Sequence, residues 1–303
     1  MSHAAITAHE LLAPAVDELC AKIREAAERV AVTGTGGYDA EAVHDLRVGL
    51  RRLRTLLRPA RSIYGKRKIR AAGAELRCFA QATGIVRDEE VLHETLLSLH
   101  LPRRTRRAVD AWLRSRGRLA REQREAAVRL LTSPADAQAA PSLDHALTAL
   151  ASVIRSRKQG KEAAVVVARA AIDAAIRRVR ELAVIASSTE DPAAMHALRI
   201  GEKRLRYTAE LFADVLPGES PRLVKEATRM QKRLGELHDF DHALTVVLQA
   251  RSLARPTRPL LIAALREARA RLAARLHDDL VAAAHAPDGG ASAGGPPRAG
   301  PRF

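Results

Sequence analysis

The chain has 303 residues, enough for one large domain or two ordinary ones, and its 51 Lys and Arg against 35 Asp and Glu give a formal net charge of +16. Such a charge predicts a polyanionic partner, which leaves nucleic acid, an anionic membrane or inorganic polyphosphate. Aromatic residues make up only 3% of the chain, which argues against a protein that stacks single-stranded bases, and the two cysteines have no paired spacing for a metal knuckle or a disulfide framework.

Ala, Leu, Arg and Glu dominate the sequence, and β-branched alternation is absent, which predicts an all-α protein. In the first half we expect helices at about residues 2–32, 40–63, 67–83, 88–99 and 103–131. Charged residues interrupt the first helix, so we expect no signal peptide and a cytoplasmic protein. The Gly-rich residues 33–37 lack the Gly-Lys-Ser/Thr ending of a P-loop and follow a helix, which indicates a flexible connection.

The helix expected at residues 40–63 carries two neighbouring stripes. Spacings of three and four residues place an apolar stripe on one face: Val43, Leu46, Leu50, Leu53 and Leu57. A basic stripe lies beside it: His44, Arg47, Arg51, Arg54 and Arg58. No Asp or Glu within the basic stripe relieves the repulsion among its cations. The pattern predicts a helix that binds an anion.

A linker rich in Pro, Ala and Ser is expected at residues 133–141, near the middle of the chain. In the second half we expect helices at about residues 143–155, 161–186, 192–215, 221–234, 240–251 and 257–284. The most apolar run, residues 163–176, is interrupted by charges and is too short to span a bilayer, so we expect no membrane partner. Residues 287–303 have no apolar periodicity, which predicts a disordered tail.

Two motifs of the first half recur in the second half with nearly the same separation. The basic stripe recurs with the residues His196, Arg199, Lys203 and Arg206. The segment Gly84–Asp88 recurs as Gly235–Asp239. Two matched motifs in one order predict an internal duplication, with halves at about residues 1–132 and 142–286. Two such helices facing each other would line a central basic cleft.

Several side chains of these motifs have competing interpretations. The stripe arginines could pair with acidic residues on neighbouring helices instead of binding an anion. Neither His44 nor His196 stands in a His-x-x-x-His arrangement, and nearby arginines would repel a cation, so we expect hydrogen bonding to phosphate and no metal. Asp88 and Asp239 follow glycines at expected helix boundaries, which favours helix capping over catalysis.

The motifs together resemble the conserved-histidine α-helical domain (CHAD) family over about residues 8–284. The resemblance rests on His44-x-x-Arg47-Val48-x-x-Arg51-Arg52-Leu53-Arg54, on His196-x-x-Arg199-x-x-x-Lys203-Arg204-Leu205-Arg206-Tyr207-x-x-Glu210, and on Leu234-Gly235-x-x-x-Asp239. Two positions depart from the family pattern. His238 stands where the family often has Asn or Arg before Asp239, and Thr83, which precedes Gly84, replaces the Leu that precedes Gly235 in the second copy.

The resemblance implies one CHAD domain at residues 1–286, built as two helical-bundle halves with pseudo-two-fold symmetry around a central basic channel. It implies binding of inorganic polyphosphate and, for some members, association with polyphosphate granules in bacteria. The candidate polyphosphate-binding residues are His44, Arg47, Arg51, Arg52, Arg54, Arg58, His196, Arg199, Lys203, Arg204, Arg206 and Tyr207. Some members are fused to a triphosphate hydrolase, whose Glu-x-Glu-x-Lys motif is absent from this sequence, so we expect no attached enzyme.

The sequence therefore predicts a non-enzymatic module that binds inorganic polyphosphate. Phosphoryl transfer normally needs a divalent metal held by carboxylates, and no Asp or Glu cluster lies among the stripe residues. We accordingly expect no catalytic residues, no cofactor and no turnover. A basic nucleic-acid-associated protein is the alternative, although no helix-turn-helix, zinc finger or aromatic RNA platform supports it.

Overall fold

The computed structural model describes residues 6–33, 39–132, 142–155, 162–189 and 191–284. Within these ranges the chain forms nine α-helices and no β-strand, with one isolated bridge between Thr7 and Ala163. The helices are α1 (Ala8–Thr33), α2 (Ala40–Tyr64), α3 (Lys66–Ser98), α4 (Arg103–Thr132), α5 (Leu143–Arg155), α6 (Ala164–Thr189), α7 (Pro192–Leu211), α8 (Ser220–Gln249) and α9 (Thr257–Ala284). The predicted all-α class is confirmed. The expected linker at 133–141, nearly all of the Gly-rich connection and the expected tail lie outside the described residues.

Two of the expected helix boundaries are wrong. Helix α3 continues through Gly84, and helix α8 continues through Gly235, where the sequence predicted a break. Asp88 and Asp239 consequently lie inside helices and do not cap new ones. A single helical Gly costs only about 1 kcal/mol relative to Ala, which tertiary packing along a long helix outweighs. Among the described glycines, Gly65 alone has a positive φ, at the turn between α2 and α3.

The apolar stripe of α2 is buried throughout its length, as predicted. Leu46, Leu50 and Leu53 are fully inaccessible and pack in the cluster that α2 shares with α1, α3 and α5. The N-terminus of α2 is capped by Asp39, whose carboxylate accepts a hydrogen bond from the backbone N–H of Ala42. Burial of this stripe fixes the rotation of α2 about its axis and therefore the direction of the basic stripe beside it.

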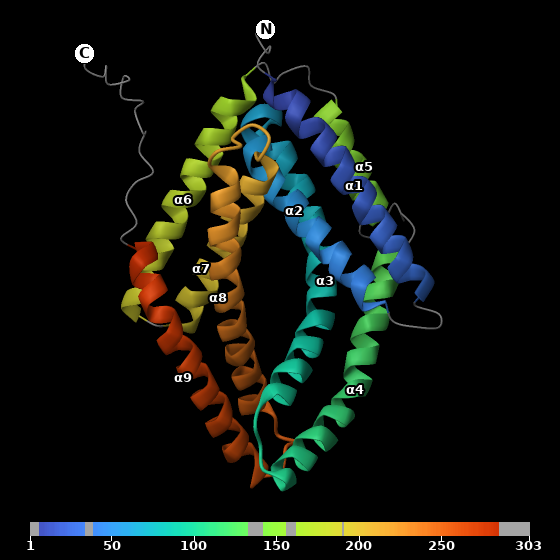
Figure 1. The fold of residues 1–303 in the computed structure, drawn as a ribbon. Coiled ribbons are helices and arrows are strands. Elements are labelled where there is room, and N and C mark those ends of the chain that lie inside the picture. The colour runs from blue at the N-terminus through green and yellow to red at the C-terminus, as the bar shows by residue number, and fades with distance from the viewer. Residues whose placement is uncertain (1–5, 34–38, 133–141, 156–161, 190, 285–303) are drawn as a thin grey trace, which may run out of the picture.

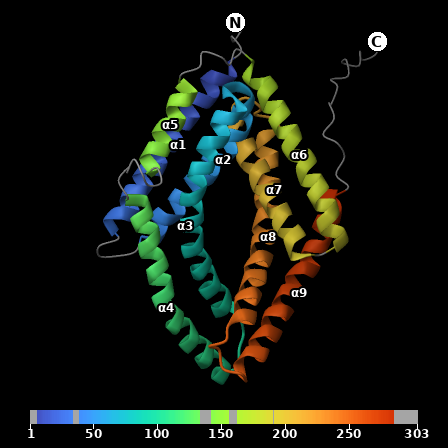
Figure 2. The same ribbon diagram turned by 180° about the vertical axis from the view of Figure 1, so that it is seen from behind.

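The helices form two sides that face each other (Figure 1). Helices α1 to α5 make one side and α6 to α9 the other, as the reverse view in Figure 2 also shows. Contacts between the sides join α1 to α6, α2 to α7, α3 to α8 and α4 to α9. Helix α5 packs on α1 and α3, although it follows the expected linker. These matched pairs are what a two-fold relation would produce, while the duplication itself stays a prediction.

Apolar packing holds the two sides together at both ends of the molecule. At one end, the cluster around α1, α2 and α5 extends to α6 and to Phe212, just after α7. At the other end, Leu92 and Trp112 of α3 and α4 share a cluster with Val247 and Leu265 of α8 and α9. Among the described residues, no helix has both the length and the apolar content of a membrane span.

Candidate anion-binding site

A pocket of about 670 Å³ lies among α2, α3 and α7, and we call it the basic pocket. Its charged lining residues are Arg51, Arg54, Arg58, Arg61, Arg70, Arg77, Arg199, Lys203 and Arg204. His196, Thr55 and Tyr207 contribute further polar groups. No Asp or Glu of the described chain belongs to this lining. The structure therefore gathers eight arginines and one lysine from three helices around one cavity.

Eight of the twelve predicted binding residues line the basic pocket. They are Arg51, Arg54, Arg58, His196, Arg199, Lys203, Arg204 and Tyr207. The four that do not line it are His44, Arg47, Arg52 and Arg206. The structure thus brings the two basic stripes together, as expected of a central cleft, while its binding role stays a prediction.

Sequence reasoning missed three arginines of the pocket wall. Arg61 lies three residues after Arg58 and extends the α2 stripe by one turn, so continuing the periodicity would have found it. Arg70 and Arg77 stand seven residues apart, which places them on one face of α3. Nothing in that spacing indicates that α3 turns this face toward α7, so the third wall required the tertiary structure.

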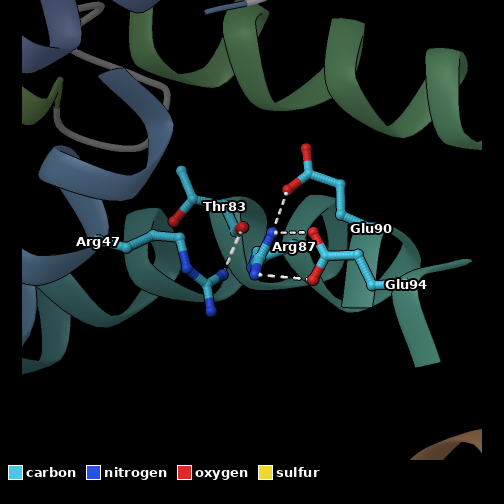
Figure 3. Close-up of polar contacts among 5 residues, drawn as sticks. All are labelled: Arg47, Thr83, Arg87, Glu90 and Glu94. Atoms are coloured by element: carbon cyan, nitrogen blue, oxygen red, sulfur yellow. Dashed lines mark hydrogen bonds and ion pairs between the residues drawn. The ribbon is translucent and has the colours of Figure 1, made fainter. Parts of the chain in front are cut away.

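Arg47 points toward α3 and not into the basic pocket. Its guanidinium donates a hydrogen bond to the backbone carbonyl of Thr83, at 2.5 Å (Figure 3). Four residues along α3, Arg87 is held by Glu90 at 3.1 Å and by Glu94 at 3.2 Å. Burial, followed by the charge of Arg51, lowers the pKa of Arg47 to about 10. Arg47 thus braces α2 against α3, and its predicted role in anion binding stays a prediction.

Arg52 and Arg206 form a separate cluster with Tyr207 and Glu210. The guanidinium carbons of Arg206 and Arg52 lie 4.6 and 5.7 Å from the centroid of the Tyr207 ring. Oxygens of Glu210 lie 3.1 Å from Arg52 Nη2 and 3.5 Å from Arg206 Nε. Both cations are thus partly neutralised beside the pocket. His44, which begins the first stripe, is exposed and lies outside the lining.

The cations inside the basic pocket are incompletely compensated. Lys203 makes no hydrogen bond or ion pair with any described residue, and burial together with the charges of Arg51 and Arg199 lowers its pKa to about 6. Nε of Arg199 is buried without a hydrogen-bond partner in the described structure. Burial also lowers the pKa of Arg199, and the carboxylates of Asp239 and Asp88 oppose that change. An anion entering the pocket would satisfy these groups and relieve their repulsion.

A histidine pair stands at one edge of the basic pocket. Nδ1 of His196 lies 3.2 Å from Nδ1 of His238, and the two ring centroids are 4.4 Å apart. Burial, followed by the charge of Arg199, lowers the pKa of His238 to about 3, so both rings are neutral at pH 7 and one can donate to the other. The described residues hold no group of three or more His, Cys, Asp or Glu placed to bind a metal. The sequence singled out His238 as a departure from the family pattern, and the structure places it against His196, which lines the pocket.

Glu202 lies on α7 next to Lys203, yet it is buried and accepts no hydrogen bond from the described residues. Burial, followed by the charge of Glu226, raises its pKa to about 8. Because the folded state holds this proton more tightly, the unfavourable contribution of Glu202 grows from pH 4.5 to pH 8. We expect Glu202→Gln to raise the thermal midpoint at pH 8.5 and to leave it nearly unchanged at pH 4.5. Calorimetric melts at both values check this, and a lowered midpoint at pH 8.5 would contradict it.

The CHAD domain family matches residues 14–248 of the chain. The uncharacterized proteins MT2285 and Rv2226 of Mycobacterium tuberculosis are each 33% identical over 215 residues, which cover 66% of this chain and 38% of each relative. This chain thus spans well under half the length of those curated relatives. The crystal structure of the CHAD domain from the plant Ricinus communis aligns with a TM-score of 0.68 at 23% identity, covering 93% of both chains, which shows a shared fold.

Proposed function

The chain belongs to the CHAD domain family, and from the site described above we propose that it binds inorganic polyphosphate in the basic pocket. The observation that carries this proposal is the lining itself. Eight arginines, one lysine and no carboxylate of the described chain line one cavity. For arginines that served only to stabilise the fold, carboxylate partners would be expected, as Arg269 has in Asp241.

The chemistry of the lining suits a chain of phosphates. Arginine presents a planar fork of donors to phosphate oxygens, and such charge-assisted hydrogen bonds are about twice as strong as neutral ones. The arginines come from α2, α3 and α7, so they can contact a bound anion from three directions. A flexible unbranched polyphosphate can enter a recessed pocket of 670 Å³, whereas the phosphates of a nucleic-acid duplex are held on a stiff helix. This difference favours polyphosphate over the nucleic-acid alternative.

We expect binding without turnover. No carboxylate of the described chain lines the pocket to hold the divalent metal that phosphoryl transfer normally uses. Orthophosphate release from polyphosphate with added magnesium or manganese, at a rate lost on changing His196, would contradict this expectation. A protein that binds the polymer is also expected to colocalise with polyphosphate granules in the cytoplasm, which a fluorescent fusion can show.

The proposal is tested by titrating the protein with long-chain polyphosphate at two salt concentrations. Because each neutralised phosphate releases condensed counterions, affinity is expected to fall steeply as salt rises. Competition with a DNA duplex at the same salt distinguishes the two polyanions. Failure to bind polyphosphate at low salt would overturn the proposal. Displacement of polyphosphate by an equal charge concentration of duplex would favour the nucleic-acid function instead.

A further inference from the structure

Among the described residues, Lys203 supplies the one primary amine in the lining of the basic pocket, beside the guanidinium groups of the arginines. An arginine keeps its proton in proteins and is a poor nucleophile, whereas a lysine that loses its proton carries a reactive lone pair. The Lys203 side chain is largely buried and has no acceptor among the described residues to hold its proton. Its position differs in this respect from Lys66 and Lys225, which are exposed on α3 and α8.

The surroundings of Lys203 favour the neutral amine. Burial, followed by the charges of Arg51 and Arg199 and then of Arg47 and Arg206, lowers the pKa of Lys203 to about 6. The charge of Lys203 in turn contributes to lowering the pKa of His238, which lies on α8. At pH 7 the Nζ atom is therefore largely unprotonated, in contrast to an ordinary lysine in water. Arg51 and Arg199, which favour loss of this proton, also line the cavity and attract anions to it.

An electrophile that reaches this amine must enter a cationic pocket, so it is expected to be an anion itself. A small acyl phosphate combines a phosphate group with an activated acyl carbon. We propose that Lys203 is a site of acylation by small acyl phosphates, which the basic pocket holds by their phosphate group. Arg51 of α2 and Arg199 of α7 line the same pocket as the amine and supply donors for phosphate oxygens.

The reaction is an ordinary acyl transfer. The lone pair of Nζ attacks the acyl carbon, a C–N bond forms, and the C–O bond to phosphate breaks with its electron pair on oxygen. The proton lost from nitrogen passes to the departing phosphate or to water, so the products are an N-acyl lysine and inorganic phosphate. Nearby guanidinium groups stabilise the charge that develops on the leaving phosphate. The amide cannot be protonated, so an acylated Lys203 could not gain a positive charge beside a bound phosphate, which would weaken polyphosphate binding.

The experiment incubates the full chain with acetyl phosphate at pH 7 and measures acetylation of each lysine by peptide mass spectrometry. Lys225 and Lys66 serve as exposed controls within the same molecule. Lys203 is expected to be acetylated roughly tenfold faster than either of them, because its amine is neutral and lies in the phosphate-attracting pocket. Long-chain polyphosphate is expected to slow the reaction at Lys203 and not at Lys225.

A neutral acetylating reagent serves as a control, because the basic pocket does not attract it. It therefore distinguishes binding of the anionic reagent in the pocket from the intrinsic reactivity of the amine. The rate ratio of Lys203 to Lys225 is expected to be several-fold larger with acetyl phosphate than with the neutral reagent. Equal ratios, or a rate at Lys203 no higher than at Lys225, would overturn the inference. A polyphosphate titration of the same sample keeps the two proposals distinguishable. Intact binding without preferential acetylation removes only this inference, and preferential acetylation without polyphosphate binding removes only the proposed function.

Discussion

Replacing Arg51, Arg54 and Arg204 together with Gln is expected to lower the affinity for polyphosphate by about two orders of magnitude or more at low salt. All three side chains line the basic pocket, and none of them pairs with a described residue. Burial, followed by the charges of Arg77 and Arg204, lowers the pKa of Arg54, as expected of cations that repel one another. The ligand-free variant is therefore expected to melt at the same temperature as the parent protein or higher.

Isothermal titration and thermal melts, with and without polyphosphate in low-salt buffer, measure both effects. The matched control replaces three exposed arginines of α4, Arg107, Arg114 and Arg121, and removes the same charge. This control is expected to keep most of the stabilisation by polyphosphate. Arg47 is left out of the pocket variant because its bond to the Thr83 carbonyl contributes to the fold. A substantially lower midpoint in the ligand-free pocket variant would mean that these arginines are scaffolding.

Replacing Lys203 with Met is expected to stabilise the ligand-free protein at pH 7 by on the order of a few kcal/mol. The pKa of Lys203 is lowered to about 6, from 10.5, by burial and then by Arg51 and Arg199. The unfolded chain binds this proton more tightly than the folded protein does. The contribution of Lys203 to the free energy of unfolding therefore falls as the pH decreases from 10.5 to 6, and it stays constant below pH 6. The advantage of the Met variant is therefore largest below pH 6 and absent above pH 10.5.

The same group is expected to take up a proton when polyphosphate binds. A bound phosphate raises the pKa of Lys203, so binding at pH 8 draws a proton from the buffer. Titration calorimetry in buffers of different ionisation enthalpy measures this proton uptake. Because the pKa values of His196 and His238 are lowered, these two side chains contribute little to proton uptake at pH 8. The uptake should be lost in Lys203→Met and kept in the exposed control Lys225→Met. Equal uptake in all three proteins would contradict a neutral Lys203 in the empty pocket.

The sequence by itself determined the helical class and the two basic stripes. Periodicity is a local property of the chain, so the apolar stripe from Val43 to Leu57 indicated both the helix and its buried face. The sequence also indicated the start of α7, because Asp191 followed by a proline at the first helical position is a capping pattern. In the structure Asp191 accepts a hydrogen bond from the backbone N–H of Ala194. Eight of the predicted residues consequently share one pocket once the helices are packed.

Only the tertiary structure decided which of these cations share the cavity. The local signals at Gly84 and Gly235 were ambiguous between a helix end and a tolerated glycine, and packing along α3 and α8 made both helices continuous. Periodicity records which face of a helix is buried, but not which helix comes to lie opposite it. For that reason the sequence did not predict that Arg70 and Arg77 line the pocket. It also did not predict that Arg47 donates a hydrogen bond to the carbonyl of Thr83. The lowered pKa of Lys203 has the same origin, because it depends first on burial and then on the charge of Arg51 from α2, and only packing supplies these two causes.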